Sequence, residues 1–288
     1  MNAGYSEAWI TDASLGIQFP LTVLYPTDET ERETRIGPYT LETAEGAEPS
    51  SGPFPLVMIS HGSGGSPLVY RTLSRYLAKS GFIVGMPEHP FDNRNDHRWK
   101  GTVQNLEYRP RHIRLAVDWV FEQERFRRCA THDAVTLIGH SMGGYTALAA
   151  AGGMPVSFPH ESPDGQSRTI EVVPDRRVKS LVLLAPATVW FQGDEALRAV
   201  DLPILMLDAE KDPYTPPFHA QIVLKGVADP TKLIYRTVEN AGHFSFLSPF
   251  PDPMINPSFL PSQDPPGFDR KQFNERLCEE ILQFLLTT

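Results

Sequence analysis

Six short runs rich in Val, Ile and Leu recur along the chain, and segments with helical periodicity lie between them. Such apolar runs are typical of parallel strands that are buried on both faces of a sheet. The runs cover residues 56–60, 82–86, 135–138, 178–184, 204–207 and 233–238. The helical segments cover residues 70–80, 109–123, 141–151, 217–225 and 269–286. This alternation predicts an α/β fold with a mostly parallel central sheet and helices on both faces.

One further strand and three loops complete the predicted organisation. Residues 19–25 alternate between apolar and polar side chains, which predicts a strand at a sheet edge. Stretches near 26–55, 152–177 and 249–267 are rich in Pro and polar residues without periodicity, which predicts loop insertions. The last two could cover an active site or be disordered. We expect a single domain over residues 1–288, with ligands bound at the carboxyl ends of the strands.

Charge and cysteine content exclude several classes of protein. The formal net charge of −9 disfavours a nucleic-acid or anionic membrane partner, because such partners bind basic surfaces. Cys129 and Cys278 have neither metal-ligand spacing nor the pattern of a disulfide framework, so both are expected to be thiols in a reducing compartment. There is no signal-peptide pattern and no run that approaches about 18 apolar residues. We therefore predict a cytoplasmic protein without a membrane span, and make no prediction of its oligomeric state.

The strongest chemical signal is the sequence GHSMGG at residues 139–144, between a predicted strand and a predicted helix. A G-x-S-x-G sequence in this context is typical of a nucleophile elbow, a turn so tight that its serine has a strained backbone. Gly139 and Gly143 lack the β-carbons that would collide with neighbouring parts of the turn. We predict that Ser141 is a nucleophile.

A serine hydroxyl needs a base to become reactive, and the base needs a partner that orients it. His243 follows the predicted strand at residues 233–238 and precedes the last predicted helix. A loop in that position lies at the carboxyl end of the sheet, where the nucleophile elbow also lies. We predict that His243 is the base.

The acid is predicted from its position after a strand. Asp212 follows the run at residues 204–207 and precedes Pro213, in a turn that could direct its carboxylate toward the base. Asp208 and Glu210 are close competitors, although Asp208 could instead accept hydrogen bonds from turn amides. We predict Asp212 as the third member of the triad.

Hydrogen-bond donors are also required, because negative charge develops on the substrate carbonyl oxygen during acyl transfer. The backbone N–H of Met142, directly after the nucleophile, is one predicted donor. The sequence HGSGG at residues 61–65 follows a predicted strand, and the N–H of Ser63 is the second predicted donor. The alternatives for this glycine-rich segment are a flexible turn or a phosphate cradle, but it lacks the rest of a dinucleotide signature.

In their order along the chain, these motifs resemble the bacterial predicted dienelactone hydrolase group of the α/β-hydrolase superfamily, which is similar to the platelet-activating factor acetylhydrolases. The resemblance extends from about residue 54 to residue 248. Its motifs are HGSGG at 61–65, PEHP at 87–90, Arg109 with Pro110, GHSMGG at 139–144, Asp212, and GHFSFL at 242–247. It implies an α/β-hydrolase fold, the same triad and oxyanion donors, and esters with short acyl groups as substrates.

Two departures narrow what this resemblance implies. Dienelactone hydrolases use a cysteine nucleophile, whereas Ser141 occupies that position here. In the plasma-type acetylhydrolases the acid follows the strand after the nucleophile helix, where this chain reads LLAPA at residues 183–187. Neither dienelactone nor phospholipid specificity is therefore carried over.

We expect a serine carboxylic-ester hydrolase that acts on a small-molecule ester through an acyl-enzyme intermediate and needs neither a cofactor nor a metal. The alternatives are a thioesterase, lactonase, amidase or acyltransferase with the same triad, or a hydrolase-fold binding protein without catalysis. The candidate pocket residues are His61, His89, Trp190 and Phe244.

A polar loop at residues 91–97 follows one of the predicted strands, at the expected edge of the site. Asp92 and Asp96 could bind a cation there, since oxygen ligands suit calcium, but a solvated turn is the favoured interpretation.

Overall fold

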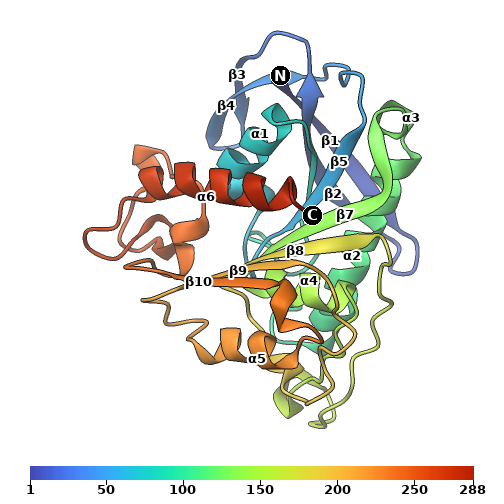
Figure 1. Ribbon diagram of the computed structural model, residues 1–288, viewed down its shortest axis with the longest axis vertical. Helices are drawn as coiled ribbons and strands as arrows, with labels where there is room; N and C mark the ends of the chain where they lie inside the picture. The colour runs from blue at the N-terminus through green and yellow to red at the C-terminus, as the bar shows by residue number, and fades with distance from the viewer.

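The computed structural model describes residues 1–288, and one half of its central sheet is parallel (Figure 1). The parallel strands are β5 (Phe54–Ser60), β6 (Ile83–Pro87), β7 (Ala130–His140), β8 (Val178–Leu184), β9 (Ile204–Ala209) and β10 (Leu233–Val238). They lie side by side in the order β10-β9-β8-β7-β5-β6, and every neighbouring pair is parallel. Each overlaps one of the six apolar runs, and β5, β6, β8 and β9 are buried along almost their whole length, which demands a nearly continuous apolar sequence.

Four N-terminal strands extend the sheet beyond β6. They are β1 (Asn2–Asp12), β2 (Ile17–Thr27), β3 (Arg32–Ile36) and β4 (Tyr39–Glu45), in the spatial order β2-β1-β4-β3. The prediction of an edge strand at residues 19–25 is wrong, because β2 pairs with β6 on one side and with β1 on the other. The prediction of a loop over residues 26–55 is also wrong, since β3 and β4 form an antiparallel pair within it. β3 exposes most of its side chains, so no apolar run marks it.

Helices cover both faces of the sheet, which confirms the predicted layers (Figure 1). They are α1 (Arg71–Lys79), α2 (Val103–Glu122), the short α3 (Glu124–Arg127), α4 (Met142–Ala150), α5 (Phe218–Gly226) and α6 (Arg270–Leu285). The side chains of α1 and α6 belong to one buried apolar cluster, and those of α2, α4 and α5 belong to a second cluster. The sheet separates the two clusters and contributes side chains to each.

Helix α2 begins six residues before its predicted start at residue 109. The hydroxyl of Thr102 accepts a hydrogen bond from the N–H of Asn105 and so caps the helix. Pro110 consequently lies inside α2 rather than in its first turn. This early start matters for the site, because it places Arg109 in the middle of a helix that packs against α4.

The two later insertions contain short 3-10 turns, at Pro159–Glu161, Asp252–Met254 and Leu260–Ser262, and one isolated β-bridge between Val156 and Thr169. Partly buried hydrogen bonds hold both insertions to the rest of the fold. The Glu161 carboxylate accepts a hydrogen bond from the indole of Trp190 at 3.0 Å. Asp264 accepts one from Ser245 at 2.7 Å and pairs with Arg270 at 2.8 Å. The second insertion is therefore attached to the segment that carries His243.

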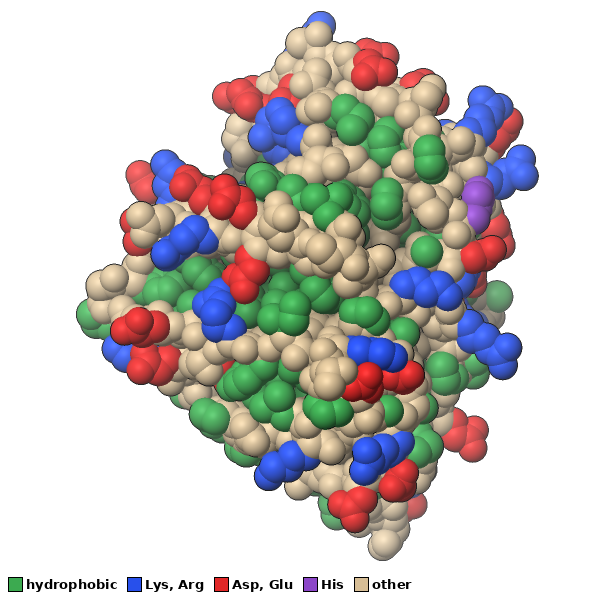
Figure 2. Space-filling model, in the orientation of Figure 1, with side chains coloured by type: hydrophobic (Ala, Val, Ile, Leu, Met, Phe, Trp, Pro, Cys, Tyr) green, Lys and Arg blue, Asp and Glu red, His purple; other side chains and the backbone are tan.

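The surface carries charges of both signs. On the face shown in Figure 2, acidic and basic side chains are interspersed and apolar side chains lie between them. None of the helices is both long enough and apolar enough to cross a membrane.

Four strand ends bring the predicted site residues to one edge of the sheet. β5 and β7 are neighbours whose last residues pair Ser60 with Gly139. β9 and β10 are also neighbours, and their last residues pair Ala209 with Val238. Because all four strands run parallel, the loops that follow them emerge at the same edge. These loops contain the predicted nucleophile, base, acid and oxyanion donors.

Candidate active site

Residues 139–144, which we name the elbow, form a tight turn between β7 and α4. Ser141 has φ 54° and ψ −120°, a left-handed conformation that is strained for any residue other than glycine. A β-carbon on Gly139 would overlap the backbone of Gly143, and one on Gly143 would overlap the carbonyl of Ser60. Glycine is therefore required on both sides of Ser141, as the motif predicts.

The predicted base and acid are in direct contact. His243 begins a 3-10 turn after β10, within residues 239–247, which we name the base loop. Its Nδ1 lies 2.6 Å from Oδ2 of Asp212, and both side chains are buried. The backbone N–H and the hydroxyl of Thr215 donate to the same carboxylate at 3.0 and 2.7 Å.

The ionisation of Asp212 determines how the imidazole is oriented. Burial acts to raise the pKa of Asp212, but the hydrogen bond and charge of His243, with the hydrogen bonds from Thr215, outweigh it and lower the pKa to about 2. An ionised carboxylate accepts the Nδ1 proton of a neutral imidazole. Nε2 is then left without a proton, in the form that a general base needs.

The contact between nucleophile and base is less direct. The Ser141 side chain is half-buried, and its hydroxyl has no hydrogen-bond partner in the protein. The ring of His243 packs against the ring of His140, the residue before Ser141, with 4.9 Å between ring centroids. In enzymes without substrate such hydrogen bonds are often long and tighten only when substrate binds. The hydrogen bond from Ser141 to His243 therefore stays a prediction.

The two competing acids have other partners. Asp208 accepts a hydrogen bond from the hydroxyl of Tyr235 at 2.7 Å. Glu210 accepts one from a backbone amide of the base loop at 2.7 Å. Neither carboxylate is hydrogen-bonded to His243, so Asp212 is the acid that the structure brings to the base.

The two predicted oxyanion donors lie on adjoining loops. Residues 61–65, which we name the oxyanion loop, lie against the elbow so closely that a β-carbon on Gly62 would be 3.1 Å from Cβ of Ser141. The backbone N–H groups of Ser63 and Met142 have no acceptor in the protein. Met142 is the first residue of α4, so its N–H also lies at the positive end of a helix.

A buried ion pair beneath the oxyanion loop determines its shape. The Arg109 guanidinium donates to Oδ2 of Asp92 at 2.9 Å and also to the carbonyl of His61. Oδ1 of Asp92 accepts hydrogen bonds from the hydroxyl of Ser63 at 2.7 Å and from the N–H of Gly64 at 3.2 Å. Arg109 is 1% exposed and Asp92 is fully buried, so this pair binds the loop from the protein interior.

Neither role that the sequence suggested for the polar loop at residues 91–97, a cation site or a solvated turn, is correct for Asp92. Its carboxylate lies in no solvated turn, and both of its oxygens already accept hydrogen bonds from protein groups. Asp96 pairs instead with Arg98 at the surface, at 2.9 Å. The two carboxylates consequently have different partners and do not form a shared cation site.

Arg109→Met is expected to lower the free energy of unfolding by about 3–5 kcal/mol, because it leaves the Asp92 carboxylate buried without a counter-charge. Urea unfolding followed by circular dichroism measures this change. Arg98→Met removes an exposed, solvent-screened pair from the same region and is expected to leave the free energy of unfolding almost unchanged. Equal effects of the two substitutions would contradict a structural role for the buried pair.

Two of the four predicted pocket residues are placed away from any surface. His61 and His89 are 1% and 0% exposed. Nε2 of His61 accepts a hydrogen bond from the N–H of His89 at 3.0 Å, and Nε2 of His89 lies 2.8 Å from the hydroxyl of Ser60. Their predicted pocket role is wrong, because both rings are buried and are hydrogen-bonded to protein groups, His61 within the oxyanion loop itself.

The other two pocket residues remain candidates. Phe244 is half-buried, and its ring centroid lies 5.1 Å from that of His243. Trp190 is half-buried on the segment that follows β8. Tyr214, which the sequence did not suggest, is 51% exposed and packs against His243 with 5.0 Å between centroids. Its position two residues after Asp212 was the available signal.

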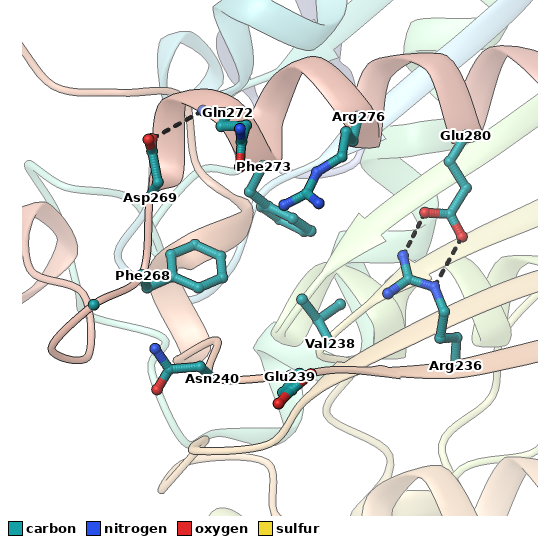
Figure 3. Close-up of a pocket in the computed structure, with 11 residues that line it drawn as sticks. Arg236, Val238, Glu239, Asn240, Phe268, Asp269, Gln272, Phe273, Arg276 and Glu280 are labelled. Carbon is teal, nitrogen blue, oxygen red and sulfur yellow. Dashed lines mark hydrogen bonds and ion pairs between the residues drawn. The ribbon is translucent and has the colours of Figure 1, made fainter.

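A separate groove of about 560 Å³ lies between α6 and the end of β10 (Figure 3). Phe268, Phe273 and Val238 line it, and an ion pair of Arg236 with Glu280 closes one side. None of the predicted site residues is part of its wall. The groove therefore lies outside the triad, and Glu239 and Asn240 at the start of the base loop form part of its wall.

Comparisons with known proteins agree with this fold. A family model for the alpha/beta hydrolase fold matches residues 55–201, and one for platelet-activating factor acetylhydrolase, isoform II, matches residues 7–96. A search of curated proteins found no match. Among solved structures, a ferulic acid esterase from Streptomyces cinnamoneus superposes with a TM-score of 0.69 at 19% identity, covering 98% of this chain and 88% of the esterase. The first model spans half of the chain, including the elbow and the oxyanion loop, and the chain thus belongs to the alpha/beta hydrolase fold family.

Proposed function

We propose that the protein is a serine esterase that hydrolyses small or short-acyl carboxylic esters. The observation that carries the proposal is the 2.6 Å contact between Asp212 and His243 at the same sheet edge as Ser141 in its strained turn. This set of groups makes a serine hydroxyl nucleophilic. The two free amides beside it supply the electrostatic part of the reaction.

In the first step, Nε2 of His243 takes the proton of the Ser141 hydroxyl while Oγ attacks the ester carbonyl carbon. The carbonyl oxygen becomes negatively charged and accepts hydrogen bonds from the N–H groups of Ser63 and Met142. The tetrahedral species then collapses, and the imidazolium gives its proton to the departing alcohol oxygen. Asp212 stays ionised throughout and stabilises the imidazolium.

In the second step, a water molecule takes the place of the alcohol. His243 accepts a proton from the water as the water oxygen attacks the acyl carbon bound to Ser141. The same two amides hold the second oxyanion, and its collapse releases the carboxylic acid and returns the proton to Ser141. No cofactor takes part in either step.

The relatives support an ester rather than another substrate class. One matching family model is named for an acetylhydrolase, and the solved structure is named as an esterase. Both names describe the release of an acyl group. In the plasma-type acetylhydrolases the acid follows the strand after the nucleophile helix, whereas Asp212 follows β9. Phospholipid specificity is therefore not part of the proposal.

The proposal predicts that a fluorophosphonate probe labels the protein once, on Ser141. Mass spectrometry of the intact protein and of its peptides measures the number and the position of labels. Preincubation with a short p-nitrophenyl ester should slow labelling, because both compounds react with the same oxygen. A protein that hydrolyses no ester and takes up no label would instead support the non-catalytic alternative.

Thioesterase, lactonase, amidase and acyltransferase activities need a separate measurement, because they use the same triad. An ester, a thioester and an amide with one common acyl group isolate the preference for the bond. A series of p-nitrophenyl esters of increasing acyl length isolates the size of the acyl site. We expect the highest kcat/KM for short acyl esters.

A further inference from the structure

The side chain of His140, directly before Ser141, points away from the solvent and into the protein. Its Nε2 lies 2.9 Å from the backbone carbonyl of His243. Its Nδ1 lies 3.0 Å from the hydroxyl of Tyr70. The exposed fractions of His140 and Tyr70 are 3% and 2%, so water does not compete for these contacts.

The direction of each hydrogen bond follows from the chemistry of the partners. A carbonyl oxygen only accepts, so Nε2 of His140 carries a proton and donates it to His243. Burial lowers the pKa of His140 to about 3, so the ring is neutral and its Nδ1 has no proton. The Tyr70 hydroxyl must therefore donate to Nδ1. Its oxygen also accepts a longer hydrogen bond, 3.4 Å, from the N–H of Gly62.

This chain of hydrogen bonds joins the three loops that carry the reaction. Gly62 directly precedes Ser63, whose N–H is a proposed oxyanion donor. His140 directly precedes Ser141, and its partner is the backbone of His243 itself. Tyr70 and His140 make no hydrogen bond to the side chains of the triad, so their contribution is to fix distances between backbones.

We propose that Tyr70 and His140 are positioning residues that hold the base loop and the oxyanion loop in register with the nucleophile elbow. This inference rests on the proposed esterase function, because it assigns the two residues to the same site. Without the hydrogen bond to its carbonyl, the His243 segment can shift relative to Ser141. Small misplacements of this kind reduce the rate of the chemical step more than they reduce binding.

The test compares three variants. Tyr70→Phe removes only the hydroxyl, and His140→Phe removes both ring nitrogens. His140→Gln keeps an N–H donor near the position of Nε2. With a short p-nitrophenyl ester, we expect kcat to fall about 10-fold in Tyr70→Phe and about 100-fold in His140→Phe, with KM changed less than about 2-fold. His140→Gln is expected to recover at least about 10-fold in kcat over His140→Phe.

Tyr25→Phe is the matched control. Tyr25 is a fully buried tyrosine in β2 whose hydroxyl donates to the carbonyl of Ala47 at 2.7 Å, away from the site. It should lower the melting temperature as Tyr70→Phe does, while its kcat stays unchanged. Melting temperatures of all variants separate loss of folding from loss of rate. Should His140→Phe fail to fold, Tyr70→Phe and His140→Gln still provide the comparison.

Two different failures can be told apart. If the wild-type protein is labelled on Ser141 and hydrolyses esters, but kcat of Tyr70→Phe and His140→Phe stays within about 2-fold of wild type, the positioning assignment is overturned and the esterase proposal stands. The same holds if Tyr25→Phe lowers kcat as much as Tyr70→Phe. If the wild-type protein is neither labelled nor active, the esterase proposal fails and the positioning assignment fails with it.

Discussion

Ser141→Ala is expected to lower kcat/KM for a short p-nitrophenyl ester by about 10⁴-fold or more. The substitution removes the only atom that forms the bond to the acyl carbon. It adds no atom to the elbow, and alanine experiences the same strain at φ 54° as serine does, so the fold should be unaffected. The remaining activity comes from the free amides of Ser63 and Met142, which still stabilise an oxyanion formed by attack of water.

The release of p-nitrophenol measures this loss, and circular dichroism checks that the variant is folded. Ser180→Ala is the control, because Ser180 is a buried serine in β8 whose hydroxyl lies 2.8 Å from that of Thr136. Its activity should equal that of the wild-type protein. Unchanged turnover in Ser141→Ala would show that another group is the nucleophile.

The protein is expected to unfold cooperatively in acidic solution, between about pH 3 and pH 5. Burial lowers the pKa of each of His61, His112 and His140 to about 3, from an ordinary value of 6.5. Between these two values the unfolded chain binds protons that the folded protein cannot bind. The free energy of unfolding therefore has its full value above about pH 6.5 and decreases as the pH falls toward 3.

The size of this loss in the free energy of unfolding determines the pH at which the protein unfolds. Each such histidine lowers the free energy of unfolding by about 1.4 kcal/mol per pH unit, so three lower it by about 4 kcal/mol. From pH 6.5 to pH 4.5 the loss is about 8 kcal/mol, which is comparable with the total stability of an ordinary domain, about 5–15 kcal/mol. Far-ultraviolet circular dichroism as a function of pH measures the midpoint.

His112→Phe tests the cause of this acid sensitivity. Both ring nitrogens of His112 are buried without a partner, and the ring already packs against Phe19 at 5.0 Å between centroids. A phenyl ring binds no proton, so two histidines instead of three contribute and a midpoint near pH 4.5 should fall by about one pH unit. His132→Gln changes an exposed histidine and should leave the midpoint where it is. A midpoint equal in all three proteins would assign the acid sensitivity to other groups.

The parallel part of the sheet was predictable because most of its strands are buried on both faces. β5, β6, β8 and β9 are almost fully buried and leave mostly apolar runs in the sequence, whereas the edge strand β10 is largely exposed and is interrupted by Arg236. β1 and the pair of β3 and β4 left no such run, since many of their side chains face solvent. Their pairing is decided by hydrogen bonds between segments far apart, such as the match of Gly4 with Ala44.

The candidate site likewise has one part that the sequence predicted and another part that it did not. The residues of the predicted triad and the predicted oxyanion donors could be chosen from the sequence because each occupies a fixed place relative to a strand end or to the elbow. Their supports were not found, because the partners are distant in sequence. Tyr70 meets His140 across 70 positions, and Arg109 meets Asp92 from the middle of a helix. His89 was assigned to a pocket because sequence position does not reveal on which side of a loop a ring is buried.

The buried pair of Asp92 and Arg109 has a consequence for protein engineering. The conformation of the HGSGG segment depends on two residues outside it, Asp92 after β6 and Arg109 in α2. Those five residues, transplanted alone into another scaffold, would form a flexible glycine-rich loop, because the hydrogen bonds to the buried pair would be missing. The graft has to include Asp92 and Arg109 as a buried pair, so that the N–H of Ser63 keeps the orientation that it has in this fold.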